Sequence, residues 1–266
     1  MTTEWSGRPL AVVTGASSGI GFALAREFAQ HGYDLVVAAE NPDIDTAAAA
    51  LRRDGRSRVV PCQVDLATFA GVEECAGAVA GTGRPVEVLA LNAGRGAGGP
   101  FVTNDLADDL EVVTLNVTGT VHLAKRLVPA MVARGRGRLL FTSSVAATAP
   151  GPFLATYSAS KAFVQSFAQA LREELRGTGV TVTALMPGAT ETPFFDRAGL
   201  RDTKLGTGEK DDPGLVAKQA VAALLAGEDH VVTGSWRHTA QVLAARVAPE
   251  TVRAAQVRRQ TEPGTG

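Results

Sequence analysis

The sequence LAVVTGASSGIG, at residues 10–21, predicts the fold because an apolar run gives way within a few residues to glycines and the start of a helical pattern. Residues 10–15 form a short apolar run, which is typical of a buried β-strand. Residues 21–32, GFALAREFAQHG, have the apolar spacing of an amphipathic helix. Glycines stand between the two. The stretch therefore indicates a strand that passes through a tight turn directly into a helix.

The same alternation of apolar runs and helical patterns continues along the chain. Further strands are expected at 34–39, 58–64, 87–92, 137–143, 180–188 and 230–234, and further helices at 44–53, 68–80, 105–134, 156–177 and 213–226. Parallel strands need crossover connections, which helices supply. Right-handed crossovers then give an α/β fold: a doubly wound, Rossmann-like parallel sheet of about seven strands with helices on both faces. The long segment 189–212 is expected to be a lid or a disordered loop.

The composition narrows the class of protein. The chain has 266 residues, 45% of them hydrophobic, and a net charge of −1. One large core is possible, and no nucleic acid or anionic membrane is indicated as an obligatory partner. The N-terminus lacks the pattern of a secretory signal, and no apolar run reaches the roughly 18 residues of a membrane span. Cys62 and Cys75 are too few for a disulfide framework or a zinc site, so we expect a cytoplasmic protein without a metal centre.

The glycine-rich turn has the features of a phosphate site. Gly15, Gly19 and Gly21 allow close approach of the backbone to a ligand. The helix that follows offers free N–H groups and the positive end of its dipole to an anion. Ser17 and Ser18 add hydroxyl donors. The G-x-x-x-G-x-G spacing differs from the G-x-G-x-x-G fingerprint but retains its physical basis.

Tyr157 and Lys161, in YSASK, are four residues apart at the start of a predicted helix. At this spacing the two side chains share one face of the helix. An ammonium group beside a phenol favours the phenolate and lowers the tyrosine pKa from its ordinary value near ~10. The pair could then transfer protons near neutral pH. The same spacing also occurs on ordinary solvated helices, so other parts of the sequence must decide.

Six motifs, in their order and spacing, resemble the short-chain dehydrogenase/reductase superfamily over roughly residues 9–235. They are TGASSGIG (14–21), LNAG (91–94), Asn116 in LNVTG, TSSVAA (142–147), YSASK (157–161) and PG (187–188). The resemblance implies a Rossmann-type sheet and hydride transfer between a nicotinamide and a carbonyl or alcohol carbon. We assign 1–235 to one dinucleotide-binding and catalytic domain and interpret 236–266, which continues past the usual end of the family's chains, as a helical tail of the same domain.

The resemblance also assigns catalytic roles. Tyr157 would be the general acid/base, and Ser144, rather than its neighbour Ser143, would orient the reacting oxygen. Lys161 would hold the nicotinamide ribose and lower the pKa of Tyr157. Asn116 would bind a water molecule that connects Lys161 to solvent.

Further residues are implied in cofactor binding, and LNAG departs from the commoner NNAG without losing its turn. The set is Gly15, Ser17, Ser18, Gly19, Ile20, Glu40, Asp65, Leu66, Asn92, Ala93, Gly94, Tyr157, Lys161, Pro187, Gly188 and Thr192.

The choice between the two nicotinamide cofactors depends on the end of the second strand. There Ala39 stands where NAD-using relatives usually carry Asp, and Glu40 where NADP-using relatives usually carry Arg. A carboxylate would repel a 2′-phosphate. We therefore favour NAD(H), while NADP(H) stays open if Arg52 or Arg53 reaches the site.

The substrate is expected to be an apolar carbonyl compound or secondary alcohol, small to bulky, because phenylalanines lie in the segments predicted to line the cleft, although each of them could equally be core packing. These segments are 94–101, 146–153 and 192–195, with Phe101, Phe153, Phe194 and Phe195. Arg95 could pair with a substrate carboxylate or simply be solvated.

The tail 236–260 predicts two short helices broken at Pro249, which could pack on their own domain, on a partner subunit or on an anionic membrane. The family's usual interface, on helices near 105–134 and 156–177, implies a homodimer or homotetramer.

Two other functions stay open: the same chemistry with NADP(H), and a catalytically idle dinucleotide sensor. A complete proton relay argues against the sensor. A nucleotide-sugar epimerase also uses Tyr-x-x-x-Lys but usually carries an additional C-terminal domain.

Overall fold

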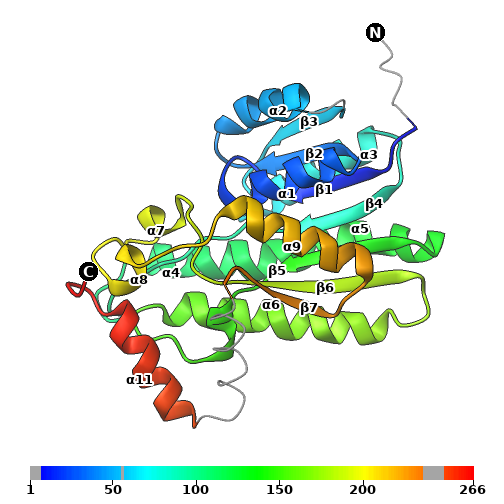
Figure 1. The fold of residues 1–266 in the computed structure, drawn as a ribbon. Coiled ribbons are helices and arrows are strands. Elements are labelled where there is room, and N and C mark those ends of the chain that lie inside the picture. The colour runs from blue at the N-terminus through cyan, green and yellow to red at the C-terminus, as the bar shows by residue number, and fades with distance from the viewer. Residues whose placement is uncertain (1–6, 55–56, 236–248) are drawn as a thin grey trace.

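The computed structural model describes residues 7–54, 57–235 and 249–266. Within these ranges a parallel sheet of seven strands has the order β3-β2-β1-β4-β5-β6-β7 (Figure 1). Its strands are β1 Leu10–Thr14, β2 Asp34–Ala39, β3 Val59–Gln63, β4 Val86–Leu91, β5 Gly137–Thr142, β6 Val180–Pro187 and β7 His230–Thr233. The α/β, Rossmann-like prediction is confirmed, and each predicted strand is present with bounds shifted by a residue or less.

Helices fill the crossovers and cover the sheet. They are α1 Gly19–Gln30, α2 Asp43–Asp54, α3 Phe69–Gly81, α4 Leu106–Val113, α5 Thr120–Arg134, α6 Ala155–Glu174, α7 Phe194–Arg197, α8 Lys204–Thr207, α9 Pro213–Ala226 and α11 Glu250–Thr261. The helix expected over 105–134 is interrupted by a π-helical turn at Thr114–Gly119. The expected loop 189–212 contains the short helices α7 and α8. Of the two predicted tail helices, α11 is observed after Pro249, whereas the other lies outside the described residues.

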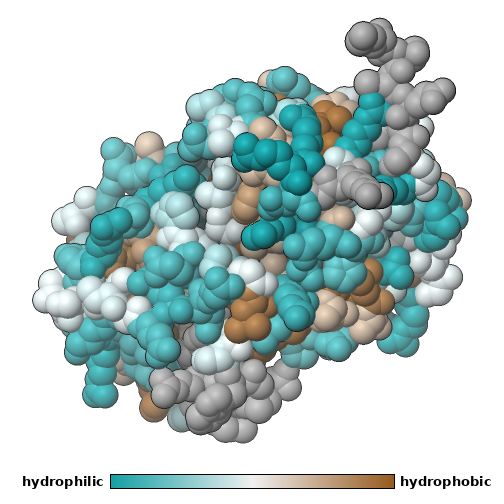
Figure 2. All heavy atoms as spheres, turned by 45° about the horizontal axis from the view of Figure 1, so that its top comes forward, coloured by the Kyte–Doolittle hydropathy of each residue, from teal (hydrophilic) through white to brown (hydrophobic). Residues whose placement is uncertain are grey.

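The core has two layers because parallel strands are buried on both faces. On one face of the sheet, α3, α5 and α6 contribute side chains such as Cys75, Leu123 and Val164. On the other face, α1 and α9 contribute Leu24 and Val221. Figure 2 shows one side of the exterior, where hydrophobic residues are scattered among hydrophilic ones. No helix in the described part of the chain is long and apolar enough to cross a membrane.

A buried carboxylate connects three strand beginnings. Asp34 is fully buried at the start of β2. Its Oδ1 accepts a hydrogen bond from the backbone N–H of Arg58, just before β3, at 2.8 Å. Its Oδ2 pairs with Nη1 of Arg84, just before β4, also at 2.8 Å. The ion pair therefore fixes the edge of the sheet opposite the carboxyl ends of the strands.

Replacing this carboxylate should cost much more stability than replacing an exposed one. We expect Asp34→Ala to lower the free energy of unfolding by about 3–5 kcal/mol, because Arg84 loses its buried partner. Asp54→Ala, which removes an exposed pair with Arg26, is the matched control and should cost no more than about 1 kcal/mol. Urea unfolding of both variants measures the difference; equal losses would contradict the assignment.

Candidate active site

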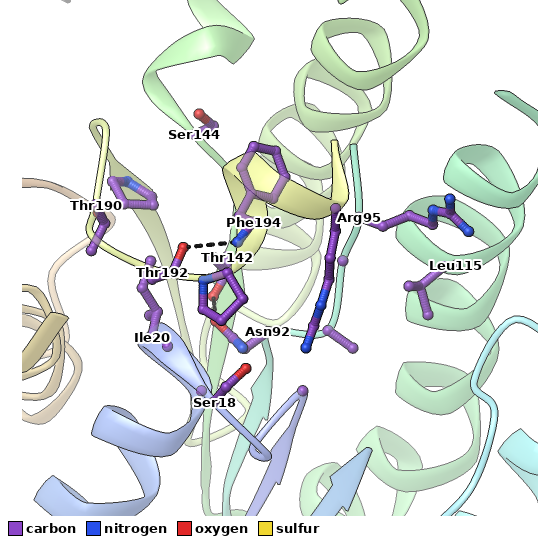
Figure 3. Close-up of a pocket in the computed structure, with 18 of the residues that line it drawn as sticks. Ser18, Ile20, Asn92, Arg95, Leu115, Thr142, Ser144, Thr190, Thr192 and Phe194 are labelled. Atoms are coloured by element: carbon purple, nitrogen blue, oxygen red, sulfur yellow. Dashed lines mark hydrogen bonds between the residues drawn. The ribbon is translucent and has the colours of Figure 1, made fainter. Parts of the chain in front are cut away.

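The site lies at the carboxyl ends of the strands, where the chain leaves β1 and β4 toward opposite faces of the sheet. In open parallel sheets a crevice forms at such a point of reversal. A cavity of about 950 Å³ follows this edge. Figure 3 shows residues from separate segments around it, among them Ser18, Asn92, Ser144 and Thr192. The cavity thus extends from the glycine turn to the start of α6.

The turn after β1 leaves no room for side chains larger than hydrogen at its glycines. Gly15 has φ +67°, and a Cβ on Gly21 would lie 2.0 Å from the carbonyl oxygen of Gly15. Ser18, at the N-cap of α1, has an extended backbone and its side chain makes no hydrogen bond to the helix. The first N–H groups of α1 therefore face the cavity without a side-chain cap, which suits a phosphate.

A hydrogen-bond network holds three strand ends together. Thr14 Oγ1 accepts from the backbone N–H groups of Asn92 and Ala93, both at 2.9 Å. Asn92 Nδ2 donates to the Thr14 carbonyl at 3.1 Å, and Thr142 Oγ1 donates to Asn92 Oδ1 at 3.1 Å. Asn92 therefore joins β1, β4 and β5. Sequence reasoning found Asn92 but missed Thr14 and Thr142, whose role depends on the alignment of separate strands.

The two candidate serines after β5 differ in their contacts. Ser143 is 1% exposed, and its Oγ donates to the carbonyl of Lys161 at 2.9 Å. Both serines line the cavity, and Ser144 Oγ accepts from the backbone N–H of Ala146 at 3.1 Å. Its hydroxyl is also a hydrogen-bonding neighbour of the Tyr157 phenol. The Ser143 hydroxyl is thus engaged with the backbone of α6, while the choice of Ser144 as the catalytic serine stays a prediction.

Lys161 and Asn116 lie side by side beneath Gly94. The Lys161 Nζ donates to the Thr142 carbonyl at 2.8 Å. Asn116 Oδ1 accepts from the backbone N–H of Arg95, and its Nδ2 donates to Ser160 Oγ, both at 2.9 Å. A Cβ on Gly94 would lie 3.1 Å from both Asn116 Oδ1 and Lys161 Nζ. A side chain at position 94 would therefore press on both of these side chains.

Asn116 owes its position to the π-helical turn, which sequence reasoning did not foresee. Such turns re-aim side chains and occur often at functional sites. Asn116 itself does not line the cavity, although it supports the strand end that does.

The predicted effect of Lys161 on Tyr157 is corrected by the structure. Burial raises the pKa of Tyr157 to about 12, and hydrogen bonding with Ser144 opposes this rise. Burial also lowers the pKa of Lys161 to about 8. The lysine nitrogen lies 5.9 Å from the centre of the tyrosine ring and bonds to a backbone carbonyl instead of the phenol oxygen. Burial therefore sets the direction of both pKa shifts.

The remaining predicted cofactor residues also line the cavity. At the end near β2 and β3 are Glu40, Asp65 and Leu66; at the other end are Pro187, Gly188 and Thr192. Asp65 Oδ1 accepts from the backbone N–H of Ala67 at 2.8 Å. The glycine turn and the backbone after β4 contribute Gly15, Ser17, Ser18, Gly19, Ile20, Asn92, Ala93 and Gly94.

The predicted substrate wall is confirmed only in part. Phe194 and Phe195 line the cavity, whereas Phe101 is 68% exposed and neither it nor Phe153 lines it. Arg95 lines it, but its guanidinium pairs with Asp108 and Glu111 of α4. Sequence reasoning missed Leu115, Leu154, Arg197 and Leu205, which reach the cavity from four separate segments.

The model of the short chain dehydrogenase family matches residues 9–202. The chain belongs to this family. It is accordingly an NAD(P)-dependent short-chain dehydrogenase/reductase that acts on carbonyl or alcohol groups of small molecules. It is 31% identical over 218 residues to the NADP-dependent 3-hydroxy acid dehydrogenase of Salmonella typhi, covering 81% of this chain and 87% of the relative.

Two solved structures show the same fold with different cofactors. A short-chain dehydrogenase from Sphingobium yanoikuyae in complex with NADPH is 31% identical, with a TM-score of 0.80 over 90% of this chain and 93% of that one. A short-chain dehydrogenase/reductase from Burkholderia phymatum in complex with NAD is 26% identical, with a TM-score of 0.82 over 100% of both chains. Relatives therefore use either nicotinamide.

The buried lysine should make stability depend on pH. Since the pKa of Lys161 in the folded protein is about 8, below the ordinary 10.5, the folded state binds fewer protons than the unfolded chain between these values. The free energy of unfolding contributed by Lys161 therefore rises with pH from about 8 to 10.5 and is lost as pH falls through about 8. Relative to Lys161→Met, we expect a gain on the order of 3 kcal/mol across this interval. Denaturant unfolding at pH 7.5, 9 and 10.5 measures it; parallel pH profiles for parent and variant would refute it.

Proposed function

We propose that this enzyme transfers a hydride between NAD(H) and an apolar carbonyl compound or secondary alcohol, with Tyr157 as general acid/base. The observation that carries the proposal is the continuity of one cavity from the glycine turn to Ser144, Tyr157 and Lys161. A phosphate site and a proton donor at opposite ends of one cavity suit a dinucleotide whose reactive ring meets a substrate.

The residues present fit a nicotinamide dinucleotide. The uncapped start of α1 would hold the phosphates, Glu40 and Asp65 the adenosine end, and Lys161 the ribose next to the nicotinamide. When bound, the nicotinamide supplies or accepts the hydride. Gly94 keeps the backbone open above Lys161 and Asn116, where a side chain would intrude.

The protein's part in the chemistry is proton transfer and orientation. Ser144 holds the substrate oxygen by a hydrogen bond, and the Tyr157 hydroxyl donates its proton to that oxygen during reduction. With a pKa of about 12 the phenol is protonated at neutral pH and ready to donate. Oxidation of an alcohol runs the same transfer in reverse, with the phenolate of Tyr157 accepting the alcohol proton. The buried amine, with its pKa of about 8, is mostly charged at pH 7.

Removing the phenol oxygen tests the proton-transfer role. We expect Tyr157→Phe to lower kcat by about 10²–10⁴-fold, because the acid/base is lost while the ring still packs at 5.1 Å against Phe194. The dissociation constant for NADH, measured by fluorescence titration, should change little. Tyr33→Phe, at a buried tyrosine of the core, is the matched control and should keep its activity. Full activity of Tyr157→Phe on a substrate that the parent converts would overturn the assignment.

The preference for NAD(H) is supported by the charges at the end of β2. Glu40 is exposed and lines the cavity, next to the buried Ala39. Arg52, the alternative phosphate partner, instead donates to the carbonyl of Val59 at 2.6 and 3.1 Å. The described cationic residues lining the cavity are Arg95, Lys161 and Arg197, and none comes from this end.

A charge series at this position tests the preference. Relative to the parent, we expect Glu40→Gln to reduce the preference for NADH over NADPH by about tenfold and Glu40→Arg to reverse it, because the repulsion of the 2′-phosphate is first removed and then replaced by attraction. The ratio of kcat/KM values for the two cofactors measures it. Asp43→Arg, on the neighbouring helix α2 outside the cavity wall, controls for a general charge effect. A parent that prefers NADPH would refute the proposal.

The substrate end supports an apolar substrate. Its lining residues are Leu115, Val145, Ala146, Leu154, Phe194, Phe195 and Leu205. Pockets of this kind bind apolar groups and orient them through a few polar atoms, here those of Ser144 and Tyr157.

A homo-oligomer is part of the proposal. Leu106 and Leu110 of α4 are 69% and 55% exposed, and Phe163 of α6 is 41% exposed. Apolar side chains gathered on two neighbouring helices favour contact with a second copy of the chain. The cytoplasmic location stays a prediction from the sequence.

A further inference from the structure

The C-terminal segment packs on its own chain, against the loop that precedes α6. Arg253 of α11 donates a hydrogen bond to the carbonyl of Thr148. Thr261 Oγ1 donates to the carbonyl of Pro152 at 2.7 Å, and Thr261 is 1% exposed. The Arg258 guanidinium lies 5.3 Å from the centre of the Phe153 ring. Three side chains of one helix therefore hold residues 148–153.

The residues after α11 contact a second segment, residues 189–212, which carries α7 and α8 and is called the lid below. Asp202 lies between these two helices. Its carbonyl accepts from the backbone N–H groups of Thr265 at 3.0 Å and Gly266 at 2.9 Å, and its Oδ2 accepts from that of Gly264 at 3.2 Å. Figure 1 shows the end of the chain beside α8. Residues 250–266 thus connect the loop before α6 to the lid.

Both connected segments form the wall at the substrate end of the cavity. Leu154 follows the first segment and packs in one buried cluster with Phe195, Ala198 and Leu200 of the lid. Tyr157 packs against this cluster. A shift of either segment would therefore change the space in front of the catalytic hydroxyl.

The loop before α6 also contains a strained residue. Phe153 has φ 60°, the only positive φ at a non-glycine residue in the described ranges. Such a conformation costs on the order of 1–3 kcal/mol and persists only where the surroundings enforce it. The surroundings here are Gly99, whose N–H donates to the Phe153 carbonyl at 2.9 Å, and the α11 contacts. The tail therefore contacts the loop at its strained residue.

We propose that residues 250–266 act as a clamp that sets the size of the substrate site by holding the 148–153 loop and the lid together. The clamp residues do not line the cavity, so they are positioning residues that act through Leu154, Phe195 and Leu205. The inference rests on the proposed carbonyl–alcohol activity. It assigns substrate selectivity to a segment outside the catalytic residues.

The test loosens the clamp without touching the cavity. The double variant Arg253→Met/Thr261→Val removes both bonds to the loop and keeps side-chain bulk. The variant is assayed with NADH on a series of ketones of increasing size. We expect its KM for the smallest good substrate to rise about three- to tenfold while kcat is retained. Its relative activity should shift toward the larger ketones. The dissociation constant for NADH should stay within about twofold, because the glycine turn is remote from α11. Arg259→Met, at an exposed position of the same helix, is the matched control and should behave as the parent.

Hydrogen exchange provides a readout that does not need turnover. We expect faster exchange at 146–154 and 198–207 in the double variant and unchanged exchange in β1–β5. Asp202→Ala removes only the bond to Gly264 and should raise the rate of exchange in the lid. This variant replaces the double variant as the test if the double variant does not fold. Unchanged exchange and an unchanged size profile would overturn the clamp. If the parent converts no carbonyl or alcohol, the proposed function fails, while exchange still decides whether the clamp exists.

Discussion

The site depends on one buried cation held at the carboxyl edge of the sheet. Lys161 donates to the carbonyl of Thr142, at the last residue of β5, from the second turn of α6. This bond positions the start of α6, and with it Tyr157, relative to the strand ends. Burial of an ammonium is costly and lowers its pKa to about 8. The side chains with perturbed pKa values thus lie where proton transfer is proposed, as is common in active sites.

Two glycines along the cavity approach their neighbours closely. Gly21 approaches the carbonyl of Gly15, and Gly94 approaches Asn116 and Lys161. These close approaches keep a path along the backbone free for a flat, elongated ligand. The π-helical turn carries Asn116, whose amide oxygen accepts from the backbone N–H of Arg95 after β4.

The two ends of the cavity are built differently. The cofactor end consists of turns fixed directly by strands, through the Thr14–Asn92–Thr142 network. The substrate end consists of a loop and a lid that make little contact with the sheet and are joined by the C-terminal segment. A rigid cofactor end and a separately held substrate end allow selectivity to change without disturbing dinucleotide binding, which fits a family in which one fold serves many substrates.

The sequence by itself determined the order of strands and helices along the chain and the glycine turn, because these follow from local periodicity and short motifs, while the candidate residues Ser144, Tyr157 and Lys161 followed from the resemblance to a family. It could not determine the pKa of Tyr157, since the balance between burial and the Lys161 charge depends on atoms brought together from β5, α6 and the lid. Nor could it locate Leu115 or Leu205 in the cavity wall, or show that Thr261 reaches Pro152. Those contacts join residues far apart in the chain, and only the packing of the whole fold decides which of them meet.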